Sequence, residues 1–329
     1  MSRTIGIRHR RKKTREGEAR PTMVAISCEI GALTSYELAD DTAELDFLMG
    51  RFPIEWRDVG ESEDISIFQK HHCKWRKVKK DEDASKFNEK HIRKILDAKG
   101  MPVVEVATKV PVKFDGLAKG DSVGMVLGGS GDRFAAALSR RGEQIEAKVF
   151  RIPPYSLAQN RNGEDKENDH ITLIFLLNLQ PELFYQVRRR DRDLIRVKEA
   201  LSMRMDAMKA RIACEQRILQ SLVGKIFLNE EGHYPEGVVE DQYDSAKAND
   251  TILQALVAEE ERRSKELSKI VELLDIWGQI FAEIKGVGPR LAAGIIAPIG
   301  DIRRFMVEPN FSGCNTPEER HKARNKAIQ

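Results

Sequence analysis

The sequence has little of what marks secreted or membrane-spanning proteins. Only 4 of its 329 residues are Cys, and 6% are aromatic. The cysteines, at positions 28, 73, 214 and 314, are too scattered for a disulfide framework. No run approaches the roughly 18 apolar residues that a membrane span needs, and no apolar segment follows the basic N-terminus as in a secretory signal. We therefore expect no membrane partner and a location in the cytoplasm.

The sequence also has almost no net charge, with 55 Lys and Arg against 52 Asp and Glu. This balance is an average over unlike segments: residues 1–20, 188–198 and 321–326 are basic, whereas residues 36–64 are acidic. Because clusters of Lys and Arg hold phosphate backbones, the basic segments predict a nucleic-acid partner. The alternative, that each run is a solvated helix face or tail, stays open.

A short segment near residue 75 carries two further signals. Lys74–Lys77 interleaves Trp75 with basic side chains, a pattern typical of contact with RNA or a single strand. Just before it, His71, His72 and Cys73 place three potential metal ligands side by side. Because no second ligand pair follows at a set spacing, the sequence favours a structural role for them over a metal site.

Residues 1–187 have the pattern of an α/β domain. Short apolar segments rich in β-branched residues alternate with turn residues and one helical run. We expect strands at 4–7, 22–27 and 33–36, a helix at 42–49 with Thr42 as its candidate N-cap, and an insertion at 53–120. Within the insertion, the pattern predicts a helix near 86–98 and strands at 103–106 and 110–114.

The clearest local unit of this domain covers residues 122–152. A buried-strand pattern at 122–127 is followed by a glycine turn at 128–131, a helix at 133–141 that ends near Gly142, and a strand at 147–152. This order predicts a βαβ unit with two parallel strands. The turn lacks the Lys-Ser/Thr of a phosphate-binding loop, so a tight turn is favoured over a nucleotide site.

Residues 188–283 have a helical sequence pattern. Apolar residues recur at spacings of three, four and seven in two series separated by a Gly- and Pro-containing loop at 232–237. The pattern predicts an antiparallel helical hairpin, a coiled coil with arms of roughly 50 Å. Such a narrow apolar seam needs a partner, so we expect a homo-oligomer formed through the hairpin.

Residues 284–305 follow the helix-hairpin-helix pattern, with an apolar residue, a Gly-Val-Gly turn and a helix that carries small apolar positions. The glycines let the backbone approach a phosphate, and the helix N-terminus offers unpaired N–H groups. Such a turn grips the DNA backbone without reading bases. The residues expected to contact DNA are Lys285, Gly286, Val287, Gly288, Pro289, Arg290, Arg303 and Arg304. An ordinary glycine turn between packed helices is the alternative.

The same segment resembles the C-terminal signature of the DEDD-type insertion-sequence transposases, the family that includes the pilin-gene invertase. The order of elements through residues 1–305 resembles that family more faintly. The resemblance implies a RuvC-like RNase H fold at the N-terminus, a coiled coil used in assembly, and DNA strand exchange in transposition. It also implies Mg²⁺ held by four acids, a nucleophilic serine, a structured guide RNA as a further partner, and a location at the prokaryotic nucleoid.

The sequence departs from the family at several of these positions. Arg8 stands where the family has its first acid, and Val126–Gly128 stands where the second acid lies. The remaining candidates for catalysis are Asp165, Glu167, Asp169 and Ser312, with Asp165 and Asp169 as the candidate Mg²⁺ ligands. The family continues beyond the hairpin, so the basic tail at 306–329 predicts a C-terminal truncation.

Three functions therefore stay open from the sequence. The first is a transposase or recombinase, and the second is a nucleic-acid-binding descendant without catalysis. The third is a coiled-coil dimerisation scaffold, against which the intact Gly-Val-Gly turn and its flanking Lys285 and Arg290 argue.

Overall fold

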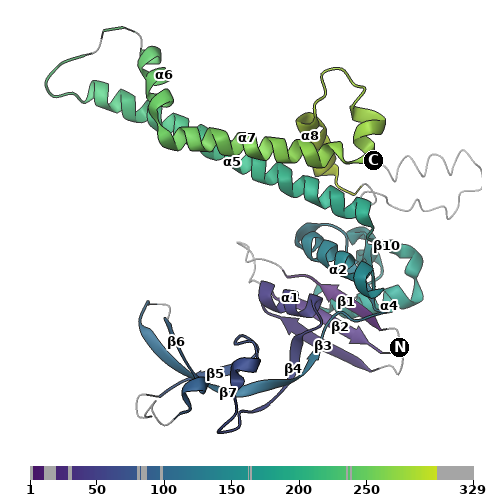
Figure 1. Ribbon diagram of the computed structural model, residues 1–329. Helices are drawn as coiled ribbons and strands as arrows, with labels where there is room; N and C mark the ends of the chain where they lie inside the picture. Colours follow the sequence, from purple (N-terminus) through teal and green to yellow (C-terminus); the bar gives the residue numbers. More distant parts are fainter. Residues whose placement is uncertain are drawn as a thin grey trace, which may run out of the picture. The chain divides into compact units, whose positions relative to one another are not determined.

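A computed structural model describes residues 3–10, 20–28, 32–79, 82, 87–96, 99–161, 163, 165–234, 236–237 and 239–301. The chain divides into two compact units, Met1–Gln186 and Val187–Gln329 (Figure 1). Arg303, Arg304, Ser312 and the tail at 306–329 lie outside the described residues. Because α/β layers and long helices are both present, the α/β class with added helices is confirmed.

The first unit is built on a six-stranded mixed sheet in the order β10-β9-β8-β1-β2-β3. Its strands are β1 (Thr4–Arg8), β2 (Thr22–Ser27), β3 (Leu33–Leu38), β8 (Ser122–Val126), β9 (Lys148–Ile152) and β10 (Tyr185–Gln186). The first three strands are antiparallel neighbours, whereas β8 runs parallel to β1 and β9 runs parallel to β8. The three parallel strands therefore end at one edge of the sheet.

A helix crosses β1 at its glycine. The helix is α4 (Asp169–Leu179), and a Cβ added to Gly6 would lie 1.9 Å from the carbonyl oxygen of His170. Only glycine allows this approach, since any side chain there would overlap the helix backbone. The close packing carries the start of α4 to the edge where β1 ends.

The βαβ unit is confirmed. β8 is followed by α2 (Asp132–Ile145) and then by β9, with Ser122 paired to Lys148 in parallel register. The predicted stop at Gly142 is wrong, because the helix continues to Ile145 and the chain turns at Glu146 with φ 60°. Gly142 instead permits close packing, since a Cβ there would lie 2.5 Å from the carbonyl oxygen of Ala147. A short helix, α3 (Pro154–Gln159), follows β9.

The first helix, α1 (Asp41–Leu48), begins one residue earlier than predicted. Its N-cap is Asp40, whose Oδ1 accepts a hydrogen bond from the backbone N–H of Ala43 at 2.9 Å. Asp is as strong an N-cap as Ser and stronger than Thr, so the acid takes the position expected of Thr42.

The 53–120 segment contributes the strands of a second, smaller sheet. Its strands are β4 (Phe52–Asp58), β5 (Lys74–Lys77), β6 (Ile92–Leu96) and β7 (Pro102–Asp115), and β7 pairs with the other three. The predicted helix near 86–98 is wrong over Ile92–Leu96, which pairs antiparallel with β7 from Ile92 opposite Val106. The long strand β7 offers backbone hydrogen-bond partners to this segment, and pairing with β7 overrides the local helical pattern because strand formation depends on cross-strand partners.

The described part of the second unit is built of helices. They are α5 (Arg189–Phe227), α6 (Val239–Asn249), α7 (Thr251–Glu272) and α8 (Pro289–Ile299). α5 and α7 lie side by side and run antiparallel, because Val197 of α5 packs with Val271 of α7, whereas the later Arg211 of α5 pairs with the earlier Glu260 of α7 at 2.6 Å. α5 begins at Arg189 and is roughly 58 Å long at 1.5 Å per residue.

The apolar core of the second unit gathers at one end of the hairpin. It joins Val197 and Ala200 of α5 to Leu267 and Val271 of α7 and to the buried face of α8. Beyond Arg204, α5 has no buried residue, and α6 has none in its described part. None of the described helices is long and apolar enough to span a membrane.

Candidate functional site

Two places carry the residues that the sequence singled out. One is the edge of the larger sheet where β1, β8 and β9 end, and the other is the turn before α8. In α/β sheets with parallel strands, functional side chains gather at the carboxyl ends of the strands. The sheet edge is therefore where a metal-dependent active site would have to form.

Arg8 occupies the end of β1. Its guanidinium Nε is buried without a hydrogen-bond partner among the described residues. Burial lowers the pKa of Arg8 below its ordinary value, and the nearby carboxylates of Glu167 and Asp169 partly oppose that shift. A cation thus stands beside two carboxylates at the end of β1.

Each predicted acid at this edge already has a partner. Asp169, the first residue of α4, receives Nε and Nη2 of Arg161 at 2.7 and 2.9 Å. Glu167 pairs with Arg20 at 2.9 Å. The Oδ1 of Asp165 accepts the backbone N–H of Glu167 at 3.1 Å, which caps a short 3-10 turn.

The glycine turn after β8 is closed by a further ion pair. Asp132 accepts the backbone N–H of Gly128 and the Nη1 of Arg151, both at 3.0 Å. Gly128 and Gly129 have φ values of 88° and 78°, so the turn needs glycine at both positions. Asp132 therefore fixes the turn, which favours a tight turn over a nucleotide site.

A buried acid from α1 also faces this side of the sheet. Glu44 accepts the hydroxyl of Thr22 at 2.7 Å and lies 3.3 Å from Nε2 of His9. Burial alone would raise the pKa of Glu44, but the hydrogen bonds from His9 and Thr22 outweigh it, so the pKa lies below its ordinary value. This carboxylate is ionised and held in place.

These contacts do not fit a Mg²⁺ site at the sheet edge. Mg²⁺ needs carboxylate oxygens that converge on an ion with near-octahedral geometry, and two-metal chemistry needs several of them. Here Arg161 forms an ion pair with Asp169, and Asp165 caps the short 3-10 turn that follows it. Within the described ranges, one group of three or more His, Cys, Asp or Glu residues brings its ligand atoms together, and it contains neither Asp165 nor Asp169.

The turn before α8 is exposed and built on two glycines. Gly286 has a φ of 87°, and Gly288 is the N-cap of α8 with extended backbone and no side-chain capping bond. Val287 packs against the core, whereas Lys285 and Arg290 are exposed. Space is open around both glycines, where an added Cβ would meet nothing within 4 Å. The turn therefore presents backbone and positive charge outward.

The hairpin is mounted on a packed base. Pro289 starts α8 at a position where its missing N–H costs nothing. Ala292, Ala293, Ile296 and Ala297 are buried against α5 and α7, and the small size of the three alanines lets the helices approach closely. This base holds the turn in one orientation.

The other basic segments are less free than the sequence suggests. In the run at 188–198, Arg189 and Arg196 both pair with Asp193, at 3.9 and 3.3 Å. Near residue 75, Lys74 lies 3.9 Å from the ring centre of Trp56, and Arg93 lies 4.3 Å from that of Trp75. Both indole rings thus carry a cation of the chain itself over one face. The basic run at 321–326 is outside the described residues.

Sequence reasoning missed the arginines that pair with these acids, and it missed Asp46. Arg161 is eight residues from Asp169, and Arg151 is 19 from Asp132, so no motif links them. Asp46 joins His71 and His72 from α1, 25 residues away in sequence. The adjacent histidines were the available signal, but their carboxylate partner lies on another element.

Compared with known proteins, the chain matches no family model and no curated sequence.

Proposed function

We propose that this chain is a DNA-binding protein related to the DEDD-type transposases, in which the catalytic metal site has been replaced by ion pairs. The observation that carries the proposal is the hairpin at Lys285–Arg290, whose backbone and two cations face outward from a packed base. DNA is the partner that such a turn fits, since a phosphate can approach glycine backbone closely.

An RNase H-like, RuvC-like fold for the first unit is part of the proposal. The supporting feature is the strand order, with three antiparallel strands followed by two that run parallel to the first. The end of β1, which would carry the first acid of such a fold, holds Arg8. The strand order thus agrees with the resemblance to the transposase family, whereas Arg8 at the end of β1 departs from it.

The ion pairs at the sheet edge favour binding over strand transfer. A guanidinium cannot lose its proton in a protein, so Arg8 brings a permanent positive charge next to Asp169. A divalent cation there would have to displace Arg161 and tolerate Arg8. An active transposase with Mg²⁺ at Asp165 and Asp169 is the alternative function, and RNA as a second partner remains with it.

Binding of this kind is electrostatic and independent of sequence. Lys285 and Arg290 would neutralise phosphates and release counterions, and the open backbone at Gly286 and Gly288 would let one phosphate approach closely. No step of this mechanism needs a metal ion. The affinity should accordingly fall steeply with salt.

The helical hairpin supports a second part of the proposal, association with another copy of this chain. Ile212 and Leu219 of α5 are seven residues apart, are both 38% exposed, and lie in the stretch of α5 that has no buried residue. A heptad pair outside the packed core is the pattern of a coiled-coil contact. A second α5 offers the same pair, so an antiparallel contact between two copies is self-complementary.

The test of the main proposal measures binding and cleavage on the same samples. The full chain is titrated into fluorescent duplex DNA at several salt concentrations, and then incubated with supercoiled and linear DNA in Mg²⁺. We expect salt-dependent binding without cleavage or strand exchange. Cleavage that needs Mg²⁺ and is lost in Asp169→Asn would favour the transposase, and the absence of binding at low salt would exclude both.

A further inference from the structure

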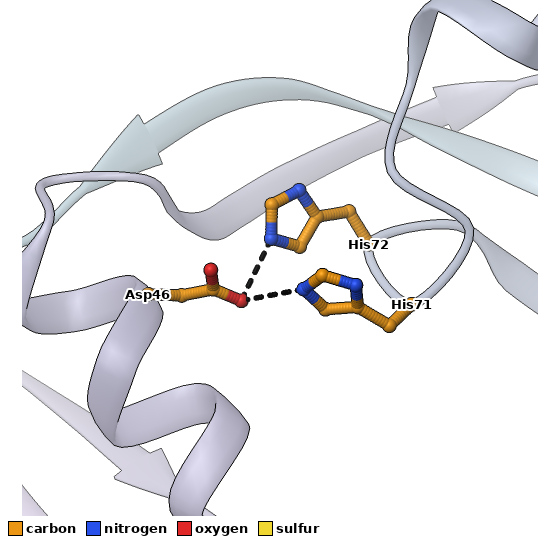
Figure 2. Close-up of side chains that lie close together, drawn as sticks. All are labelled: Asp46, His71 and His72. Atoms are coloured by element: carbon orange, nitrogen blue, oxygen red, sulfur yellow. Dashed lines mark hydrogen bonds and ion pairs between the residues drawn. The ribbon is translucent and has the colours of Figure 1, made fainter.

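The structure assigns a second, separate site: Asp46, His71 and His72 form a binding site for a divalent transition-metal ion of the zinc type. Figure 2 shows both imidazole rings directed at one carboxylate oxygen of Asp46. The Nε2 atoms of His71 and His72 lie 2.8 and 2.7 Å from Oδ2. All three ligand atoms lie within 4.8 Å of one another.

The site joins two elements of the first unit. Asp46 lies on α1, and the histidines lie between the 3-10 turn Ile65–Ile67 and β5, beside the smaller sheet. A buried carboxylate between two histidines is also a stable hydrogen-bonded arrangement without an ion. Three observations favour a metal ligand set.

The first observation is that two of the three ligands, Asp46 and His72, are held by neighbouring side chains. The other carboxylate oxygen of Asp46, Oδ1, accepts Nε of Arg51 at 2.9 Å, which leaves Oδ2 as a single ligand atom. The backbone carbonyl of His72 accepts a hydrogen bond from Nε1 of Trp56 at 2.9 Å, and the imidazole ring of His72 packs 5.5 Å from the ring of Phe114. Metal ligands in proteins are oriented by such outer contacts.

The second observation is the ionisation of the carboxylate. The Oδ1 of Asp46 pairs with the guanidinium Nε of Arg51 at 2.9 Å, and the guanidinium of an arginine is always charged. Asp46 therefore offers the charged form that a metal ion requires.

The third observation is a graded exposure. Asp46 and His72 are 2% and 5% exposed, whereas the side chain of His71 is 45% exposed. An ion bound here has a low-dielectric wall on one side and water on the other. Three protein ligands with a fourth, water-accessible position is the pattern of open zinc sites.

Little movement is needed to admit the ion. Tetrahedral Zn²⁺, with bonds of about 2.0–2.1 Å to nitrogen and oxygen, places its ligand atoms about 3.3 Å apart. The present nitrogen-to-oxygen distances of 2.7 and 2.8 Å must widen by about half an ångström. The half-exposed His71 can supply that shift by rotating outward.

The ligand types select the class of metal. Two imidazole nitrogens and one carboxylate oxygen suit Zn²⁺ and its neighbours in the transition series, whereas Mg²⁺ and Ca²⁺ prefer oxygen alone. Cys73 is not a member of the group, because its Sγ donates a hydrogen bond to the backbone carbonyl of Gln69 at 3.7 Å. The site is thus independent of any Mg²⁺ chemistry and of DNA binding.

Zinc binding to the full chain tests the proposal. Metal-free protein is titrated with ZnCl₂ by calorimetry, with bound metal counted after dialysis, and thermal unfolding is recorded with and without the ion. We expect one Zn²⁺ per chain and a higher melting temperature with zinc. The variants Asp46→Asn and His71→Ala should each weaken binding by more than about 100-fold, because even the loss of an outer partner costs about 10–100-fold.

Two controls separate this result from loss of folding or adventitious binding. His71→Ala removes a half-exposed side chain, so its circular dichroism should match that of the parent. His233→Ala removes a histidine that is 83% exposed and far along the sequence, and it should bind zinc like the parent. Substitution with Co²⁺ should give the visible bands of nitrogen and oxygen ligation without thiolate charge transfer.

The proposal is overturned by three outcomes. One is a parent protein that binds no zinc at micromolar concentration. Another is a folded His71→Ala variant with unchanged affinity. The third is a Co²⁺ spectrum with thiolate bands, which would place the ion on a cysteine.

Discussion

Arg161 holds Asp169 through two parallel hydrogen bonds, from Nε at 2.7 Å and from Nη2 at 2.9 Å. The bond to Asp169 raises the pKa of Arg161 against the opposing effect of burial. Asp169 is also buried and lies near Arg8. The acid that the sequence offers for catalysis is thus the acid that the fold uses to neutralise cations at the sheet edge.

Removing this arginine should cost stability. Arg161→Ala leaves a buried carboxylate without its partner and should lower the free energy of unfolding by about 2–4 kcal/mol. Urea unfolding followed by circular dichroism measures the change. The control Arg140→Ala, whose side chain is 70% exposed and pairs with Glu143, should cost less than about 0.5 kcal/mol. Equal effects of the two variants would mean that the pair at Asp169 is not a buried one in solution.

Variants of the turn before α8 should separate the contribution of side-chain charge to DNA affinity from that of the glycine backbone. Lys285→Ala should reduce the slope of log affinity against log salt by about 0.9, the value for one phosphate contact. Gly288→Ala has an ordinary backbone conformation and open space around its Cβ, so it should fold normally and still weaken binding by blocking the phosphate. Fluorescence anisotropy with duplex DNA measures both.

A lysine away from the hairpin provides the matched control for these measurements. Lys265 of α7 is 72% exposed and pairs with Glu261. Lys265→Ala removes the same charge and should leave the salt slope unchanged. A drop equal to that of Lys285→Ala would argue for diffuse attraction by the whole unit.

Gly6→Ala should disrupt the first unit. The new Cβ would lie 1.9 Å from the carbonyl oxygen of His170, so β1 and α4 must separate, at a cost above about 3 kcal/mol. Gly124 of β8 lies opposite Gly6 in the sheet, and a Cβ added to Gly124 would meet its nearest atoms at 3.4 Å. Gly124→Ala should therefore cost under about 1 kcal/mol. Melting temperatures of the two variants test the difference, and a stable Gly6→Ala would rule out this crossing.

The stability of the first unit should depend on pH through Glu44. Its pKa lies below the ordinary value of 4.5, so the stability that it contributes is fully present above pH 4.5 and is lost as the pH falls through the folded pKa. Glu44→Gln should show a shallower loss of melting temperature below pH 4.5 than the parent. Parallel profiles for parent and variant would exclude this contribution.

Association through the hairpin should depend on its exposed heptad pair. The parent is expected to sediment as a dimer at micromolar concentration, and the double variant Ile212→Glu with Leu219→Glu as a monomer of unchanged helix content. Sedimentation velocity measures both. A parent that is monomeric throughout would exclude the contact between copies.

Several features were readable from the sequence because their causes are local. The βαβ unit follows from a buried-strand pattern, a glycine turn and a helical period within 31 residues, and the register of Ser122 opposite Lys148 matches it. The two long helices follow from apolar spacing alone. The turn at Gly286–Gly288 follows from the need for positive φ at Gly286.

Other features could not be read because their causes lie far apart along the chain. Ile92–Leu96 becomes a strand because β7 offers it a ladder, not because of its own pattern. The partners of Asp169 and Asp132 are arginines from the loop after α3 and from β9. Asp46 meets His71 and His72 only when α1 packs beside the smaller sheet.

The sequence by itself therefore determined the succession of elements, the long hairpin and the glycine turn, since periodicity and backbone freedom act over a few residues. The tertiary structure alone decided which charges face each other. Folding brought an arginine to Asp169 and another to Glu167, and it brought a carboxylate to the histidine pair. Side-chain electrostatics depend on distance in space, and distance in sequence does not reveal it.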